Sequence, residues 1–298
     1  MKNAIVTGGA GFIGSNLVKI LLDDGYNVTV LDVENFNDSN LIDIIDKIDV
    51  YEYNGDLDKL LIYFNNKTVD VIFHLASCIV GFHTINDVDR MLDSNIKLGV
   101  HMLELMKKNN IKYFINTGTF SQHFTSTDEY IPTNLYAATK QAFIDMMKYY
   151  SDVEKMKCLT LKLFDNYSEK DIRIKLINLI AQNCGTDIET NLTLGEQDMN
   201  LTHAEDVCRA FVCAHEYLIN SSETYEEFYV YSPVTLSVKD TVKLYEEVNG
   251  CQINVNWGGK DYRPMEIMKL KRAYKTLPNW HPRISLENGF KKLGDSLK

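Results

Sequence analysis

The chain has 298 residues, of which 45% are hydrophobic and 24% charged, and its formal net charge is −10 at pH 7. This composition is typical of a globular protein with one large core or two smaller ones. The acidic balance argues against nonspecific binding to nucleic acid or to an anionic membrane surface. No apolar run approaches the roughly 18 residues that a membrane-spanning helix needs. A strand-like segment at the very start leaves no room for a signal peptide, so we expect a cytoplasmic protein.

Short apolar segments alternate with segments of helical periodicity through the first half of the chain. The expected strands are residues 3–7, 27–32, 50–53, 70–76, 112–117 and 158–164. The expected helices between them are residues 12–24, 38–47, 57–65, 87–109 and 134–150. Strands that recur after helix-sized gaps indicate βαβ units, and therefore a parallel sheet covered by helices on both faces. The predicted fold class is α/β, a doubly wound parallel Rossmann sheet.

The alternation becomes less regular after residue 165. Helical patterns remain at 171–183, 203–220 and 237–249, with short strand-like segments at 227–231 and 253–257. We therefore predict a Rossmann domain over residues 1–165 and a smaller, mixed α/β substrate-binding lobe over residues 166–298. We expect the helix at 203–220 to pack back on the first domain.

The six cysteines are scattered, mostly within apolar segments, and form no CxxC motif or zinc-type cluster with histidine. We expect free thiols in a reducing compartment rather than disulfides. The cysteines are Cys78, Cys158, Cys184, Cys208, Cys213 and Cys251. The seven histidines are also dispersed, and we predict no metal site.

The segment GGAGFIG, residues 8–14, follows the first expected strand and opens the first expected helix. Glycines at this point permit a tight turn, let the backbone approach a pyrophosphate, and let helix and strand pack closely. The first amides of the helix then face the phosphates. Asp32 ends the second strand about 20 residues further on, where a carboxylate binds the adenosine ribose hydroxyls and repels a 2′-phosphate. The pattern predicts a dinucleotide site that favours NAD, with NADP not excluded.

Asp56, in the segment NGDL after the third strand, has two possible roles. Its carboxylate either binds the adenine amino group of the dinucleotide or caps the helix that follows.

Tyr136 and Lys140 lie four residues apart at the start of an expected helix, so their side chains share one face. A phenol ionises near pH 10, and an adjacent ammonium is expected to lower that pKa toward a value useful for proton transfer. We predict that Tyr136 exchanges a proton with a substrate oxygen, while Lys140 also holds the nicotinamide ribose.

At this point the chain resembles the extended short-chain dehydrogenase/reductase superfamily, the NAD-dependent epimerase/dehydratase family, over essentially its whole length. The matching segments are TGGAGFIG (7–14), GDL (55–57), HLAS (74–77), Asn95 in SNIKLG, the Tyr136/Lys140 pair and LGEQDMNLTHAEDV (194–207). The resemblance implies Thr119, after the fifth strand, as the catalytic hydroxyl beside Tyr136 and Lys140. It also implies cofactor contacts by Gly8, Gly11, Phe12, Ile13, Gly14, Asp32, Asp56, Leu57, Leu75, Ala76, Ser77, Asn95, Thr117, Tyr136 and Lys140.

Extended members of this superfamily mostly act on nucleotide-activated sugars, and the resemblance therefore implies a nucleotide-diphosphate sugar as substrate. Segments 257–268 and 277–289 resemble those of CDP-abequose and CDP-paratose synthases, which reduce 4-keto sugars. Arg173 and Arg263 are candidate clamps for the diphosphate, with surface ion pairing as the alternative. Asn166 is a further candidate for substrate binding, beside Asp165 and Ser168, where relatives carry Asn and Gly.

The two residues after Thr119 bear on which reaction of the family this chain catalyses. Dehydratases of the family place Asp-Glu there as acid and base for the loss of water, whereas this chain has Phe120-Ser121. The leading hypothesis is a 4-keto-6-deoxyhexose reductase, and the alternative is a C4 epimerase that retains NAD. Asp32 favours NAD, although many reductases prefer NADPH. A third alternative, a catalytically idle NAD-sensing regulator, does not need an acid/base pair.

In this family the helices corresponding to 87–109 and 134–150 pair across a two-fold axis, which implies a homodimer. The expected apolar seam consists of Leu98, Met102, Leu105, Met146, Met147 and Tyr150.

Overall fold

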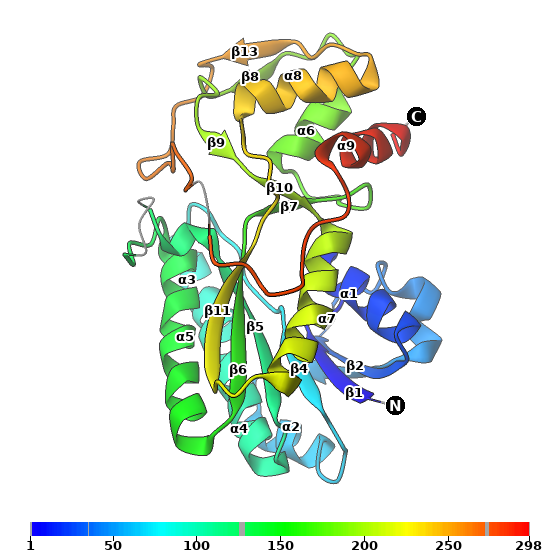
Figure 1. Cartoon of the computed structure of the whole chain (residues 1–298), viewed down its shortest axis with the longest axis vertical. Helices are drawn as coiled ribbons and strands as arrows, with labels where there is room; N and C mark the ends of the chain where they lie inside the picture. The colour runs from blue at the N-terminus through cyan, green and yellow to red at the C-terminus, as the bar shows by residue number, and fades with distance from the viewer. Residues whose placement is uncertain (1, 35, 125–128, 272–273, 298) are drawn as a thin grey trace.

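A seven-stranded parallel sheet lies at the centre of the lower part of the molecule in Figure 1. The computed structural model describes residues 2–34, 36–124, 129–271 and 274–297. The strand order is β11-β6-β5-β4-β1-β2-β3, and each neighbouring pair is parallel. The strands are β1 (Lys2–Thr7), β2 (Tyr26–Val33), β3 (Asp49–Tyr53), β4 (Val71–His74), β5 (Tyr113–Thr119), β6 (Lys157–Leu163) and β11 (Tyr225–Val230). The predicted doubly wound α/β fold is confirmed.

Helices cover both faces of this sheet, and each face has its own apolar core. Alternate residues of a strand point to opposite faces, so Val6 enters one core and Ile5 the other. The first core lies under α1 (Phe12–Asp23) and α7 (Ala204–Asn220). The second lies under α2 (Leu57–Tyr63), α4 (Leu98–Asn109) and α5 (Leu135–Glu154).

The helix expected at 87–109 is interrupted. It consists of α3 (Val88–Leu92), a π-helical turn at Asp93–Lys97, and α4. Single π-turns occur frequently at functional sites, and this one contains Asn95, which is fully buried. Short 3₁₀ segments complete this part of the fold: η1 (Ile42–Lys47), within the helix expected at 38–47, η2 (Ile85–Asp87) and η4 (Phe120–Gln122).

A smaller lobe follows the carboxyl end of β6 and lies at the top of Figure 1. Its helices are α6 (Leu176–Asn183), α8 (Val238–Asn249) and α9 (Leu286–Asp295). Its strands form the pairs β7 (Asp165–Tyr167) with β10 (Leu201–His203), β9 (Asp198–Met199) with β12 (Leu236–Ser237), and β8 (Thr190–Leu192) with β13 (Val255–Trp257). Tyr167, Tyr245 and Phe290 are the largest side chains of its separate core.

Two elements after residue 165 return to the main sheet. Helix α7 packs on α1, where Phe211 and Leu17 share one core, as expected for the helix at 203–220. The strand expected at 227–231 is the edge strand β11, with Phe228 opposite Leu161 of β6. The division of the chain at residue 165 therefore stays a prediction.

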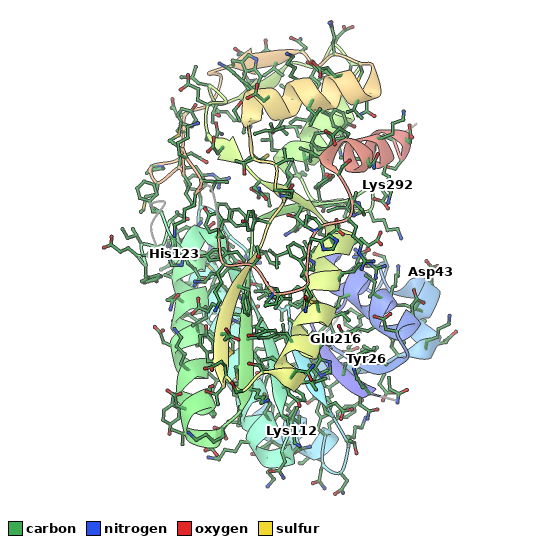
Figure 2. The ribbon with its side chains drawn as sticks, viewed as in Figure 1. Tyr26, Asp43, Lys112, His123, Glu216 and Lys292 are labelled. Atoms are coloured by element: carbon green, nitrogen blue, oxygen red, sulfur yellow. A yellow bond between two sulfur atoms is a disulfide. The ribbon has the colours of Figure 1, made fainter. Side chains whose placement is uncertain are left out.

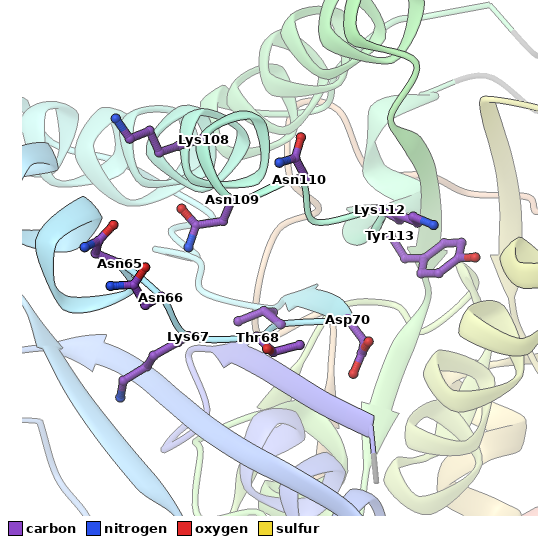
Figure 3. A pocket seen from close by; sticks show the side chains of 11 residues that line it. Asn65, Asn66, Lys67, Thr68, Asp70, Lys108, Asn109, Asn110, Lys112 and Tyr113 are labelled. Carbon is purple, nitrogen blue, oxygen red and sulfur yellow. The ribbon is translucent and has the colours of Figure 1, made fainter.

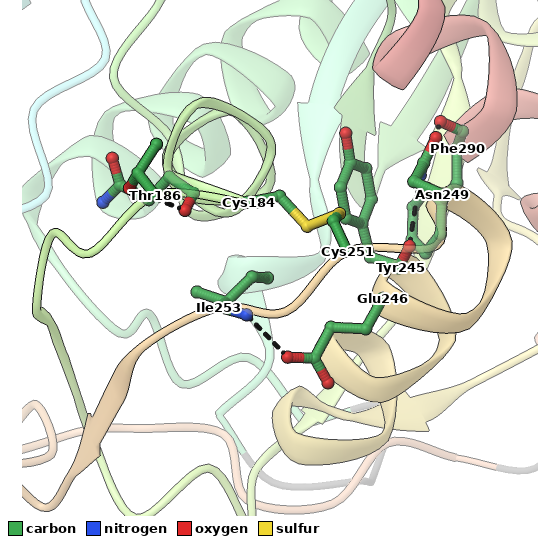
Figure 4. The surroundings of a disulfide bond; sticks show 9 residues. Cys184, Thr186, Tyr245, Glu246, Asn249, Cys251, Ile253 and Phe290 are labelled. Atoms are coloured by element: carbon green, nitrogen blue, oxygen red, sulfur yellow. Dashed lines mark hydrogen bonds between the residues drawn. A yellow bond between two sulfur atoms is a disulfide. The ribbon is translucent and has the colours of Figure 1, made fainter.

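The expectation of six free cysteines is wrong for two of them, because Cys184 and Cys251 form a disulfide (Figure 4). Cys184 directly follows α6 and Cys251 lies just beyond α8, and their Cα atoms are 5.7 Å apart. They are separated by 67 residues, so only the packing of the lobe brings them together. The other four, Cys78, Cys158, Cys208 and Cys213, are free thiols.

The expected dimer seam is also wrong in most of its residues. Leu98, Met102, Leu105 and Met147 are buried in the core of their own chain, because the interior of this doubly wound fold already uses those faces of α4 and α5. The hydroxyl of Tyr150 donates to Glu104 of α4. Among the described residues, no helix combines the length and apolar character needed to cross a membrane.

Candidate active site

The glycine segment turns tightly between β1 and α1. Gly8 has a φ of +68°, and a Cβ on it would lie 2.7 Å from Cα of Ala76. A Cβ on Gly14 would collide with the carbonyl oxygen of Gly8. Gly11 is the N-cap of α1 and has no side chain with which to cap it, so the first amides, including those of Phe12 and Ile13, point out of the helix end. The cradle therefore fits a pyrophosphate.

Asp32 lies beside this turn, near the end of β2. Its Oδ2 accepts a hydrogen bond from the Ala10 amide at 3.0 Å, and its Oδ1 accepts one from the Val33 amide at 3.0 Å. Burial raises the pKa of Asp32, and the two amide hydrogen bonds oppose that rise. The structure brings together the glycines and the acid that the sequence pairs.

The segment after β4 forms the wall opposite Gly8. The hydroxyl oxygen of Thr7 accepts hydrogen bonds from the amides of Leu75 and Ala76, each at 3.1 Å. Because its two lone pairs are used in this way, its O–H donates to Nδ1 of His74, 2.8 Å away. Thr7 is a supporting residue that was not predicted, and its position at the end of β1 is the one sequence signal for such a role.

Asn95 supports the same wall from the π-turn. Its Oδ1 accepts from the Cys78 amide at 2.8 Å and from the Ser77 hydroxyl at 3.2 Å. Its Nδ2 donates to the carbonyl oxygen of Cys78 at 3.1 Å and to Oγ1 of Thr139 on α5 at 3.0 Å. The side chain is buried and its polar atoms are bonded to protein groups, so Asn95 holds Ser77 in place, and the direct cofactor contact expected of it stays a prediction.

Tyr136 and Lys140 are buried together on one face of the first turns of α5. Burial raises the pKa of Tyr136 to about 12, and a hydrogen bond with the Ser77 hydroxyl lowers it only in part. Burial also lowers the pKa of Lys140 to about 7. The expected depression of the Tyr136 pKa by Lys140 is therefore wrong for the protein alone, because desolvation disfavours both charges.

The two threonines at the end of β5 have different surroundings. The Thr117 hydroxyl donates to the carbonyl oxygen of His74 at 2.9 Å, so a backbone group already uses the proton of this expected cofactor ligand. Thr119 is 6% exposed, and its hydroxyl oxygen accepts from the Ser121 amide at 3.3 Å. The Thr119 hydroxyl can still donate its proton. The amide of Thr119 donates to Oε1 of Gln122 at 3.0 Å, a support that no sequence pattern predicts.

Asp56 is the N-cap of α2, and its Oδ1 accepts from the Lys59 amide at 3.1 Å. Leu57 is the first residue of that helix. The structure thus shows the capping role, and the adenine contact stays a prediction.

Asn166 and Arg173, two of the four candidate substrate residues, meet above the cofactor turn. The Arg173 guanidinium forms two hydrogen bonds with the Asp171 carboxylate, at 2.6 and 2.7 Å, and donates to Oδ1 of Asn166 at 3.2 Å. It also lies 4.2 Å from the ring centre of Phe12, so it joins the smaller lobe to the first turn of α1. Arg263 lies elsewhere, 5.7 Å from the ring centre of Phe82 in the loop after β4.

A cavity of about 620 Å³ lies away from these residues (Figure 3). It is lined by the loops that precede β4 and β5, and so it lies at the amino ends of the strands. Ligands of open α/β sheets bind at the carboxyl ends, so we assign the active site from the side-chain geometry. Among the described residues there is no cluster of three His, Cys, Asp or Glu side chains able to hold a metal ion.

Comparison with known proteins agrees with this geometry. Residues 4–226 match the NAD dependent epimerase/dehydratase family, so the chain belongs to this family and is an NAD-dependent enzyme. It is 22% identical to CDP-abequose synthase of Salmonella muenchen over 295 residues, which cover 98% of this chain and 97% of that protein. It is 24% identical to UDP-glucose 4-epimerase of Halalkalibacterium halodurans over 315 residues, covering 95% and 92%.

Solved structures of sugar-nucleotide epimerases share the fold. UDP-glucose 4-epimerase of Thermotoga maritima, solved with UDP-glucose, has a TM-score of 0.83 at 21% identity and covers 99% of this chain and 98% of its own. UDP-glucose 4-epimerase of Brucella ovis, solved with NAD, has a TM-score of 0.85 at 18% identity and covers 100% and 98%.

Proposed function

We propose that this enzyme reduces the 4-keto group of a nucleotide-activated 6-deoxyhexose. The observation that carries the proposal is the similarity to CDP-abequose synthase over nearly the whole of both chains. The pair Phe120-Ser121 directly after Thr119 argues against the competing dehydration, since neither side chain can serve as the acid or base that loss of water requires. The substrate is accordingly a nucleotide-diphosphate sugar, with the reacting carbon C4.

The proton chemistry assigned to the chain's own residues suits reduction. When bound, the nicotinamide supplies hydride to the carbonyl carbon. Tyr136 keeps its proton at neutral pH because burial raises its pKa to about 12, so it can donate that proton to the oxygen that gains negative charge. The Thr119 hydroxyl donates a hydrogen bond to the same oxygen. Ser77, held by Asn95, keeps the Tyr136 hydroxyl oriented.

We propose that substrate binding uses the smaller lobe. Asn166 and Arg173 lie together beside Phe12, where an arginine suits a diphosphate. Because Asp171 neutralises Arg173, the guanidinium acts mainly as a pre-oriented hydrogen-bond donor there. Arg263, on the loop near Phe82, is proposed as a second contact.

A C4 epimerase that retains NAD is the second candidate function. It is favoured by Asp32, whose carboxylate lies against the glycine turn and would repel the 2′-phosphate of NADP. The structural similarity to UDP-glucose 4-epimerases supports the fold of such an enzyme. An idle NAD-sensing protein is disfavoured, since a sensor does not need Tyr136 and Lys140 buried side by side.

Turnover assays separate the candidates. Purified protein is incubated with CDP-, dTDP- and UDP-4-keto-6-deoxyglucose and either NADH or NADPH, and absorbance at the NADH band is followed. In parallel, UDP-glucose is incubated with NAD and its conversion to UDP-galactose is measured. Reductase activity requires stoichiometric oxidation of NADH or NADPH by a 4-keto substrate. Interconversion of the UDP-sugars without net oxidation of cofactor would instead establish the epimerase.

We further propose a cytoplasmic homodimer. Met146, Tyr149 and Val153 follow one another along α5 at helical spacing and are 41%, 62% and 55% exposed, and Leu92 on α3 is also exposed. A second copy of the chain would cover this surface, which replaces the seam expected from the sequence. Sedimentation at micromolar concentration tests the idea: the wild type should be dimeric, and Tyr149→Glu should be monomeric.

A further inference from the structure

His123 lies in the loop that follows Thr119, and both of its ring nitrogens have hydrogen-bond partners. Nε2 is 2.9 Å from Nζ of Lys162, and Nδ1 is 2.8 Å from the carbonyl oxygen of Glu129. An ammonium group only donates, and a carbonyl oxygen only accepts. Nε2 therefore accepts and Nδ1 carries the proton, so the two contacts select one neutral tautomer of His123.

Lys162 forms an ion pair with a carboxylate on the neighbouring strand. Its side chain is buried, and Nζ is 2.5 Å from Oε2 of Glu227 on β11. Glu227 also accepts from the Tyr225 hydroxyl at 2.7 Å and lies 3.2 Å from Nζ of Lys148 on α5. Burial by itself raises the pKa of Glu227, but the charge and hydrogen bond of Lys162 bring it down to about 2. The ammonium that faces His123 is thus paired and fixed in position.

This cluster lies directly beside the catalytic strand end. Lys162 is opposite Gly118 in the pairing of β6 with β5, one residue before Thr119. Gln122, the neighbour of His123, accepts the hydrogen bond from the Thr119 amide. The His123 amide in turn donates to the carbonyl oxygen of Phe120 at 3.1 Å. A displacement of His123 would therefore pass to Thr119 through two hydrogen-bonded neighbours in the chain.

The charges around His123 oppose its protonation. Burial lowers the pKa of His123, and Lys162 and Lys271 lower it further, whereas Glu227 and the hydrogen bond to the Glu129 carbonyl raise it. A protonated ring would set an Nε2–H group against the Lys162 ammonium at 2.9 Å, where neither group can accept. Figure 2 shows His123 near the upper end of α5, at the level of the boundary between the sheet domain and the smaller lobe.

We propose that His123 and Lys162 are positioning residues that hold Thr119 for catalysis while His123 is neutral. The inference rests on the proposed function for the role of Thr119. A structural ion pair at the β6–β11 edge would hold the sheet together without any link between the charge of His123 and the geometry of Thr119. The test must therefore follow that link.

The experiment compares three variants with the wild type. His123→Gln keeps a neutral side chain that can accept from Lys162 and donate to Glu129 at every pH. His123→Leu removes both hydrogen bonds. Lys148→Met is the matched control, since it removes a half-exposed cation from the same carboxylate, Glu227, without touching His123. For each protein, kcat and KM for the sugar nucleotide are measured across the acid range, and urea unfolding checks that the fold is intact.

We expect His123→Leu, which removes both positioning hydrogen bonds, to lower kcat about tenfold, with KM changed by less than about threefold. The wild type and Lys148→Met should lose kcat in acid through one shared ionisation, and His123→Gln should lack that ionisation. An acid limb unchanged in His123→Gln would overturn the proposal.

A readout without turnover separates this inference from the proposed function. The Thr119 methyl resonance is followed by carbon-13 NMR as the pH is lowered, together with the imidazole resonances of His123. In the wild type both should move with one midpoint, and in His123→Gln the Thr119 methyl should not move. If the Thr119 methyl resonance does not shift while His123 titrates, His123 does not position Thr119, even if the enzyme turns over its sugar nucleotide as proposed. Failure to turn over any sugar nucleotide refutes the proposed function. The NMR titration still decides whether the charge of His123 changes the environment of Thr119.

Discussion

Replacing Lys140 with methionine should stabilise the protein in the absence of cofactor. Lys140 is fully buried, and among the described residues its Nζ meets no hydrogen-bond partner. Burying an unpaired ammonium is unfavourable, while methionine fills a similar volume without a charge. The stabilisation should come with a loss of turnover, because residues that are unfavourable for stability at an active site are usually needed for activity.

The pKa of Lys140 determines the size and the sign of the effect. It falls from 10.5 to about 7 on burial, and each unit corresponds to about 1.36 kcal/mol. Between these two values the unfolded state binds more protons than the folded state, so wild-type stability rises with pH through that window. The variant lacks this slope. Its advantage should be about 4 kcal/mol near pH 7 and about 2 kcal/mol near pH 9.

Urea unfolding of the cofactor-free proteins at these two pH values is the assay. Lys162→Met is the matched control, because Lys162 is also buried but is paired with Glu227 at 2.5 Å. Removing Lys162 takes one of the two cationic partners from the partly buried Glu227 carboxylate and should destabilise the protein. The reasoning fails if Lys140→Met is destabilising, or if its advantage over the wild type is the same at both pH values.

The remaining predictions concern the cofactor turn, the catalytic pair and the disulfide. Tyr136→Phe should lower turnover by roughly 10²–10⁴-fold without changing NADH binding measured by fluorescence, and Thr119→Val should cost less, so a near-wild-type rate for Tyr136→Phe would remove the residue from its role. Asp32→Ala should weaken NAD binding and relax discrimination against NADP, and a wild type that already prefers NADP by about 1.4 kcal/mol would contradict this. Gly14→Ala places a methyl group against the Gly8 carbonyl oxygen and should lower stability by about 1–3 kcal/mol, visible as a lower Tm. Cys184→Ala opens a cross-link between residues 67 apart and should lower stability by about 4 kcal/mol; an unchanged urea midpoint, with or without dithiothreitol, would argue against the disulfide.

Local patterns in the sequence determined the fold class and the elements of the main sheet. Alternation of short apolar runs with helical periodicity predicts βαβ units without any knowledge of distant contacts, and β1 to β6 all lie where it places them. The glycines at 8–14 and Asp32 are equally local signals. The turn leaves no room for a Cβ at Gly8 or Gly14, and the acid lies near the end of the next strand. The four-residue spacing of Tyr136 and Lys140 likewise determines that they share one face of α5.

Tertiary packing decided what depends on residues far apart in the chain. The apolar pattern that contains Leu98 and Met102 does not distinguish a helix face buried in its own core from one buried in a subunit interface. The packing of α4 on the sheet is what buries both residues. The disulfide between Cys184 and Cys251 requires α6 and α8 to meet, and β11 joins the sheet only because it finds the free edge of β6. The pKa values of Tyr136 and Lys140 follow from burial, which no spacing rule contains. Sequence patterns reflect the conformational preferences of residues that are close in the chain. Desolvation of side chains and pairing between distant elements depend on the folded structure.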